Sequence, residues 1–209
     1  MIFARAHAGW MASLLVACGT REIPIQSQEA VTLSTAAAPA TASAARPSDD
    51  DGAEAARANV AKGDAEFEAA ARDPSRIANA KSYFEAALIP AGNPVFGYAA
   101  YKLAFVYWNR SDFDRSLDMF KKAIDFGAAH PEVEGATTIH DAALHDVVPI
   151  YAVVGQPAKA FNFFRVLSGD DAHALHMLEA LGREYDATGK LADAKAVQTE
   201  LKRRDPSRP

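Results

Sequence analysis

Apolar residues recur at spacings of three and four positions along residues 101–123, and a short polar turn divides them into two runs. This period is typical of amphipathic helices, because it keeps the apolar side chains on one helical face. The face consists of Leu103, Ala104 and Tyr107 in the first run and of Phe113, Ser116, Phe120 and Ala123 in the second. The stretch therefore predicts two antiparallel helices, and Ser111 or Asp112 in the turn can cap the second one.

The same frame recurs towards the end of the chain. Tyr151 follows Tyr107 by 44 residues, and Tyr185 follows Tyr151 by 34. The ten additional residues of the longer interval fall near 127–136, whose composition indicates a loop. Pro157 is expected in the first turn of a helix, where a missing N–H costs nothing. Pro149, by contrast, lies inside a predicted helix and is expected to kink or break it.

An earlier, degenerate unit precedes these. Ala80, Phe84 and Ala87 stand 36 positions before Ser116, Phe120 and Ala123. We therefore expect a first helix pair over residues 57–92, with Phe67 as the anchor of its first helix.

This pattern resembles the tetratricopeptide repeat (TPR), whose consensus is W-x2-L-G-x2-Y, then A-x3-F, then P. The matching residues in the last unit are Leu181, Gly182, Tyr185, Ala194 and Pro206, with Leu178 at the Trp position and Gln198 at the Phe position. The middle unit fits the frame with Leu144, Val147, Tyr151, Gly155, Ala160 and Phe164. The resemblance implies an all-α helical-hairpin solenoid of about three to four repeats, at about 57–92, 97–130, 141–174 and 175–208.

The beginning of the chain has a different character. Residues 1–17 contain one charge, Arg5, and an apolar run too short to span a bilayer, which suits a secretory signal peptide. Leu15, Val16 and Ala17 precede Cys18, the single cysteine. This order resembles the lipobox of bacterial lipoproteins, which implies cleavage before Cys18 and acylation of that residue. The alternatives are a chance cysteine behind an ordinary signal peptide and a buried N-terminal helix.

Residues 18–56 are rich in Ala, Pro, Thr and Ser and show no sustained apolar period. Such a segment buries too little apolar surface to offset its ordering entropy, so we expect a disordered linker behind the lipidated Cys18. An Ala-rich helix over residues 36–46 is the alternative. The repeat domain is then expected from 57 to 209.

Charge and cysteine content narrow the function classes. The formal net charge of −5 argues against a general nucleic-acid or anionic-membrane binder. The basic residues near the end of the chain are expected to favour a helix C-terminus. With Cys18 lipidated, no thiol remains for a disulfide or a Cys-based metal site. We expect no cofactor, no metal and no small-molecule substrate.

Two His-Asp doublets raise the hypothesis of a catalytic site. His140-Asp141 and His145-Asp146 are five positions apart, so they lie on different helical faces, whereas zinc-binding His on a helix are commonly four apart. Metal-dependent phosphohydrolases also use a His-Asp doublet, but none of their surrounding pattern is present. We expect no catalytic residue; the alternative is a periplasmic hydrolase or enzyme accessory that uses these pairs.

The candidate partner-binding groove combines aromatic and polar residues. Tyr101, Phe105 and Trp108 share one face next to the Tyr107 face, and they either pack against adjacent helices or line a concave groove. The polar groove candidates are His145, Glu179, Arg183 and Asp186.

The resemblances imply a membrane-anchored TPR adaptor that binds other proteins of a bacterial envelope complex through this groove. Residues 102–127 also look like the repeat lipoproteins of myxobacterial adventurous gliding motility, which would place the adaptor in that machinery. The lipid anchor and Gly19 after the cysteine imply an outer-membrane location facing the periplasm.

Overall fold

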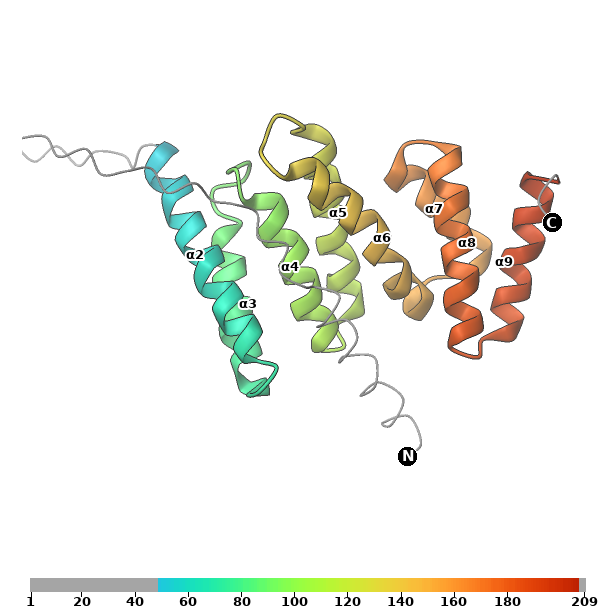
Figure 1. Cartoon of the computed structure of the whole chain (residues 1–209), viewed down its shortest axis with the longest axis horizontal. Coiled ribbons are helices and arrows are strands. Elements are labelled where there is room, and N and C mark those ends of the chain that lie inside the picture. Colours follow the sequence, from blue (N-terminus) through green and yellow to red (C-terminus); the bar gives the residue numbers. More distant parts are fainter. Residues whose placement is uncertain (1–48, 207–209) are drawn as a thin grey trace, which may run out of the picture. The chain divides into compact units, whose positions relative to one another are not determined.

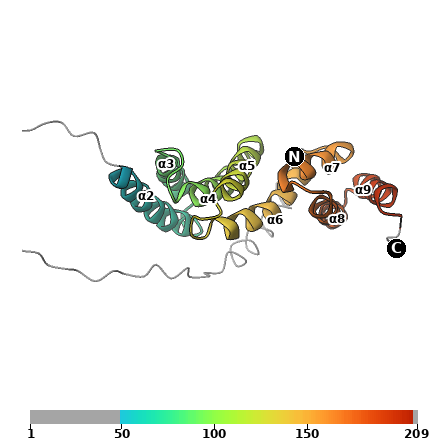
Figure 2. The ribbon, with the colours of Figure 1, turned by 90° about the horizontal axis from the view of Figure 1, so that it is seen from above.

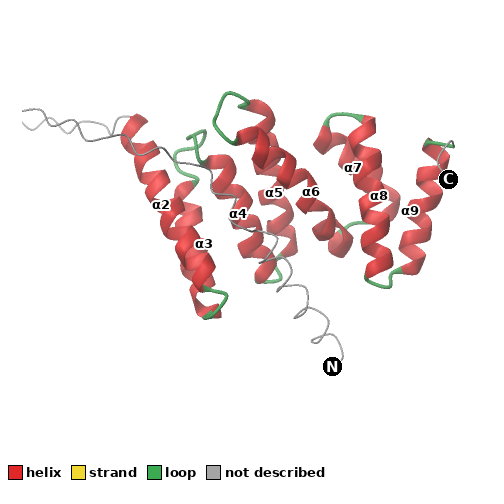
Figure 3. Ribbon diagram, viewed as in Figure 1, coloured by secondary structure: helices red, strands yellow, loops and turns green. Residues whose placement is uncertain are grey.

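The computed structural model describes residues 49–206, which are part of one compact unit, Ala45–Pro209. The predicted signal peptide, Cys18 and the linker up to residue 48 lie outside the described residues. Within the described part the chain is all-helical and has no strand, which confirms the predicted all-α class (Figure 3). Its α-helices are α2 (Asp49–Ala69), α3 (Ile77–Ala87), α4 (Phe96–Asn109), α5 (Phe113–Ala129), α6 (Ala136–Val154), α7 (Pro157–Ser168), α8 (Asp171–Ala187) and α9 (Leu191–Arg204), with a 3-10 turn at Pro74–Arg76.

The helices alternate between two rows. We call α2, α4, α6 and α8 the first row and α3, α5, α7 and α9 the second row. Neighbours within the first row pack against one another, and each first-row helix leads into a second-row helix (Figure 1). Seen from above, the labels of α3, α5 and α7 lie on one side and those of α2, α4, α6 and α8 on the other (Figure 2).

Helix α2 begins at Asp49, eight residues before the expected start of the folded part. The expected linker boundary at residue 56 therefore differs from the structure over residues 49–56. The reason is that alanines which suggested a linker are buried: Ala53 is 9% exposed and Ala56 is fully buried. A Cβ added at Gly52 would lie 3.2 Å from the Pro90 side chain, so this first turn also packs against the loop after α3.

The boundary between α5 and α6 also differs from the expectation. A loop was expected near 127–136, but α5 runs to Ala129 and α6 begins at Ala136, ahead of the expected start at 141. Gly127 explains the close approach of the two helices, because a Cβ there would lie 2.6 Å from both the Ala136 carbonyl oxygen and the His140 Cβ. Glycine at this position acts as a packing residue and not as a loop signal.

The turns follow the expected capping chemistry. The Asp112 side chain accepts a hydrogen bond from the backbone N–H of Arg115 at the start of α5, as predicted. Pro157 occupies the first turn of α7, also as predicted. Gly169 adopts a φ of +79° where α7 ends, a conformation that glycine reaches without steric cost.

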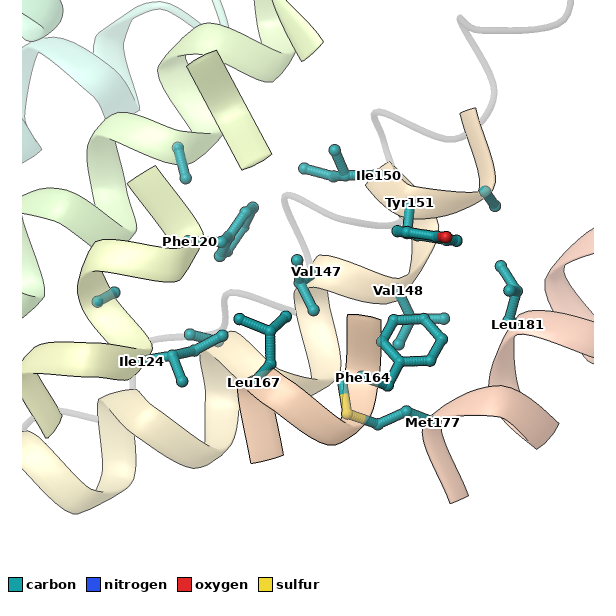
Figure 4. Packing of buried hydrophobic residues seen from close by; sticks show 14 of the residues in the cluster. Phe120, Ile124, Val147, Val148, Ile150, Tyr151, Phe164, Leu167, Met177 and Leu181 are labelled. Carbon is teal, nitrogen blue, oxygen red and sulfur yellow. The ribbon is translucent and has the colours of Figure 1, made fainter. Parts of the chain in front are cut away.

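A continuous core runs between the rows. Phe84, Phe120 and Phe164 are fully buried and belong to α3, α5 and α7. Tyr185 of α8 is 1% exposed. Figure 4 shows the middle of this cluster, where residues of α5, α6, α7 and α8 meet. Each helix pair buries its apolar face against its neighbours as well as within itself, as stacked helix pairs do.

Helix α6 continues through Pro149, so of the kink or break expected there the break does not occur. Proline cannot donate to the carbonyl oxygen of His145, four residues earlier. The side chain of His145 is 85% exposed, so water can reach that carbonyl and replace the missing donor. The cost of the proline is therefore small enough for packing on both sides of α6 to keep it helical.

Candidate protein-binding surface

Three aromatic side chains form a cluster between α4 and α5. The ring centroids of Tyr101 and Phe105 are 5.1 Å apart, and each meets the buried Phe120 edge to face, at 5.8 and 5.2 Å. Edge-to-face contact is the favoured arrangement of such rings. Tyr101 and Phe105 are half-buried, so they pack against the core and also reach the surface of the first row.

Asp146 joins α4 to α6 at the edge of this cluster. The Tyr101 hydroxyl donates to Oδ2 of Asp146 at 2.6 Å, and Oδ1 of Asp146 lies 2.7 Å from Nδ1 of His145. The Asp146 side chain is only 21% exposed, whereas that of His145 is 85% exposed. The half-buried carboxylate therefore orients the imidazole, whose Nδ1 it contacts, and the rest of the ring is exposed. The structure thus brings Tyr101, Phe105 and His145 together, through an aspartate that the groove prediction did not include.

The other polar candidates lie along α8. Nη1 of Arg183 is 3.9 Å from Oε1 of Glu179, and Nδ1 of His176 is 3.9 Å from Oε2 of the same carboxylate. Asp186 is exposed less than one turn beyond Arg183. These residues form a charged stripe on one helix, a group separate from the Tyr101–Asp146–His145 group.

Trp108 takes a different position from the other aromatic candidates. It lies in the last turn of α4, and its ring meets Phe113 of α5 edge to face, with centroids 6.1 Å apart. This contact closes the α4–α5 turn. Trp108 is therefore a packing residue of the turn, and only part of its surface is exposed.

A further polar link between α2 and α4 was not anticipated. Nζ of Lys102 lies 3.2 Å from Oδ1 of Asp64, and the Tyr98 hydroxyl donates to Oδ2 of the same carboxylate at 3.0 Å. The ammonium group also lies 5.0 Å from the ring centroid of Phe67, within cation–π range. Tyr98 and Lys102 are four apart on α4 and Asp64 and Phe67 are three apart on α2, a spacing that could have indicated the link.

The last turn of α6 is capped by Lys190, which lies between α8 and α9. Nζ of Lys190 donates to the Ala152 carbonyl oxygen at 2.6 Å, one of the carbonyls that the end of the helix leaves without an intrahelical donor. Nearby, burial raises the pKa of the Glu184 carboxyl, and the charge of Lys190 opposes that rise. Burial also raises the pKa of Tyr185 to about 12, and Lys190 lies 5.5 Å from its ring centroid.

The two His-Asp doublets remain apart in space. His140 Nδ1 lies 3.0 Å from Asp141, and His140 packs on Gly127 of α5, whereas Asp146 contacts Tyr101 of α4. Over residues 49–206 no group of three or more His, Cys, Asp or Glu side chains could hold a metal ion. Nor is any helix in that range long and apolar enough to cross a membrane.

No family model matches the chain, and neither a curated protein nor a solved structure matches it.

Proposed function

We propose that this chain is a lipid-anchored adaptor of a bacterial cell envelope, and that its four helix pairs are tetratricopeptide repeats. The adaptor binds another envelope protein through the first row of helices. The pairs are α2–α3, α4–α5, α6–α7 and α8–α9, in the order and near the positions that the repeat pattern requires. Acylation of Cys18 is the proposed anchor, and an outer-membrane location facing the periplasm is the proposed place.

The observation that carries the proposal is the junction at Asp146. One half-buried carboxylate contacts both Tyr101 of α4 and His145 of α6, and the half-buried Phe105 lies beside Tyr101. Aromatic rings combined with oriented polar groups are typical of protein-binding surfaces. Two adjacent first-row helices thus present one continuous patch, which a partner can contact without any change in the fold.

The resemblance of residues 102–127 to repeat lipoproteins of adventurous gliding motility supports a place in that machinery. We propose it as the first envelope complex to examine. The partner list from the experiment below is the measurement that decides it.

The test is a pull-down of the tagged chain with membrane fractionation and mass spectrometry of the bound proteins. Wild type is compared with Cys18→Ser and with His145→Ala, and Lys121→Ala on the opposite row serves as the surface control. We expect Cys18→Ser to leave the membrane fraction and His145→Ala to stay there without its partner. A partner that His145→Ala and Lys121→Ala retain equally would overturn the proposed surface, and a Cys18→Ser protein that stays in the membrane would overturn the anchor.

A further inference from the structure

A hollow of about 610 Å³ lies between α5 and α7, away from the Asp146 junction. The end of α6 supplies its floor with Tyr151, Val154 and Gly155, and Leu117 of α5 and Phe163 of α7 complete its apolar part. The Tyr151 hydroxyl donates to the carbonyl oxygen of Gln156 at 3.0 Å, so its proton is already engaged. The polar lining comes from Asp114, Gln156, Lys159 and Asn162, so the hollow combines an apolar part with polar walls.

The two walls carry opposite charges. Asp114 stands on the α5 side and Lys159 on the α7 side, and both side chains are exposed. Neither has an ion-pair partner among residues 49–206. Beside the hollow, the last turn of α6 exposes apolar surface, with Val153 46% and Val154 38% accessible.

From this arrangement we infer that the hollow is the centre of a symmetric interface with a second copy of the chain. A twofold axis through the floor of the hollow lays the α5 wall of one copy on the α7 wall of the other. Asp114 of each copy then lies opposite Lys159 of the other copy. The interface therefore contains two equivalent ion pairs. Self-complementarity of this kind is the requirement for an isologous dimer.

The apolar residues fit the same symmetry. Val154 lines the hollow and Val153 precedes it on α6, and both are partly exposed, so the axis brings the apolar surfaces of the two copies face to face. A stable interface buries roughly 1,200 Å² or more in total, so the contact extends over the exposed faces of α5 and α7 around the hollow. The inference does not rest on the proposed adaptor function, because the two surfaces share no residue.

Substitutions that reverse the charge of Asp114 or Lys159 test the proposed dimer. The full chain is purified in mild detergent and its mass is measured by sedimentation across the micromolar range. We expect a monomer–dimer equilibrium in wild type. Lys159→Glu and Asp114→Lys should each weaken it about tenfold or more, because each change places two like-charged pairs across the interface. The double variant should regain the wild-type constant.

Matched controls on another helix separate this effect from general charge. Arg57→Glu and Glu68→Lys make the same charge changes at exposed positions of α2, outside the hollow and the faces of α5 and α7, and should leave the equilibrium unchanged. Circular dichroism checks that Asp114→Lys remains folded, since Asp114 also favours the start of α5. A wild-type protein that stays monomeric overturns the inference, and so does a double variant no better than the single ones.

A cross-link provides the second readout. In the Cys18→Ser background the chain has no other cysteine, so Val154→Cys places one thiol on each side of the twofold axis. Oxidation should yield a disulfide-linked dimer, whereas Gln198→Cys on α9 should not. Equal cross-linking of the two variants contradicts the proposed interface.

Discussion

The α4–α5 and α6–α7 pairs share one sequence frame but pack differently. Helices α4 and α5 lie against each other along most of their length, whereas α6 and α7 touch over only a few residues. Helix α6 instead packs closely on α5 and on α8. Equivalent positions in the repeat pattern therefore do not guarantee equivalent contacts.

The pairs also differ in residue size at one set of equivalent positions. In α4–α5 these positions hold Ala104 and Ser116, and the Ser116 hydroxyl donates to the Ala104 carbonyl oxygen at 2.8 Å. The equivalent residues of the next pair are Val148 and Ala160. In α8–α9 they are Gly182 and Ala194, and those helices again pack closely. Small side chains at both positions let the backbones approach, and we expect the larger Val148 to keep α6 and α7 further apart.

The largest expected effect falls on a feature that the two pairs have in common. Phe120 and Phe164 occupy equivalent positions and are both fully buried. Phe120→Ala and Phe164→Ala should each lower the free energy of unfolding by about 3–5 kcal/mol, because a large cavity forms in the core. Denaturant unfolding measures both. If Phe164→Ala costs under about 1 kcal/mol, the α6–α7 pair does not share the common core.

Ala104→Val copies the Val148 situation into α4–α5 and should have the next largest effect. The added methyl groups overpack a fully buried position and push Ser116 away from its acceptor, at a cost of about 1–3 kcal/mol. Ala128→Val, on the exposed face of α5, controls for helix propensity. Equal melting temperatures of the two variants would show that the close approach does not depend on residue size.

The reverse substitution, Val148→Ala, is best measured by the distance between α6 and α7 and not by the free energy of unfolding. Val148→Ala should let α7 move towards α6. Spin labels at the exposed positions His145 and Val166 report this movement as a shorter distance. An unchanged distance would indicate that the neighbours of α6, and not Val148, hold the pair apart.

The sequence indicated the helix pairs well, because their apolar period and their small residues are local signals. It did not indicate that α2 starts at Asp49, since a buried alanine stripe and an alanine-rich linker have similar composition. Nor did it separate α6–α7 from the other pairs, because Val148 is apolar and satisfies the period. In the candidate site, helical spacing was enough to name Tyr101, Phe105 and His145, but the link through Asp146 depends on the contact between α4 and α6, which is not a local signal.

The end of α6 provides the fourth test of the comparison, because a hydrogen bond from Lys190, and not from α7, caps it. Lys190→Met keeps the aliphatic stem but removes the donor to the Ala152 carbonyl oxygen. We expect a loss of about 1–2 kcal/mol, typical of a hydrogen bond from a charged group. Lys195→Met, exposed on the same helix, should change the stability very little. Thermal unfolding of the two variants makes the comparison.

The smallest expected effect concerns the contact that holds α7 to α9. The Arg204 guanidinium carbon lies 3.3 Å from the ring centroid of Phe161, and Glu200 binds both Arg203 and Arg204. Hydrogen bonds from Arg203 and Arg204 lower the pKa of Glu200 to about 2, although burial opposes this. Because the pKa is lower in the folded state, the ionised carboxylate stabilises the protein above pH 4.5, and this contribution is lost as the pH falls towards 2.

Glu200→Gln measures that contribution. Solvent screens the cluster, so we expect a loss of only about 1 kcal/mol at neutral pH. The difference between wild type and variant should shrink as the pH is lowered and vanish near the folded-state pKa. Glu68→Gln, at an exposed position of α2, is the control. A difference that is constant with pH would assign the effect to packing and not to charge.

The contact between Lys190 and the Ala152 carbonyl also bears on how such an array can be shortened. Stacked helix pairs are often treated as modules that can be removed one at a time from an end. Here a chain that stops after α8 would lack residue 190, and the last turn of α6, two helices earlier, would lose its cap. Removal of the C-terminal pair therefore affects a helix outside that pair: besides the packing on α8, α6 loses its hydrogen bond from Lys190.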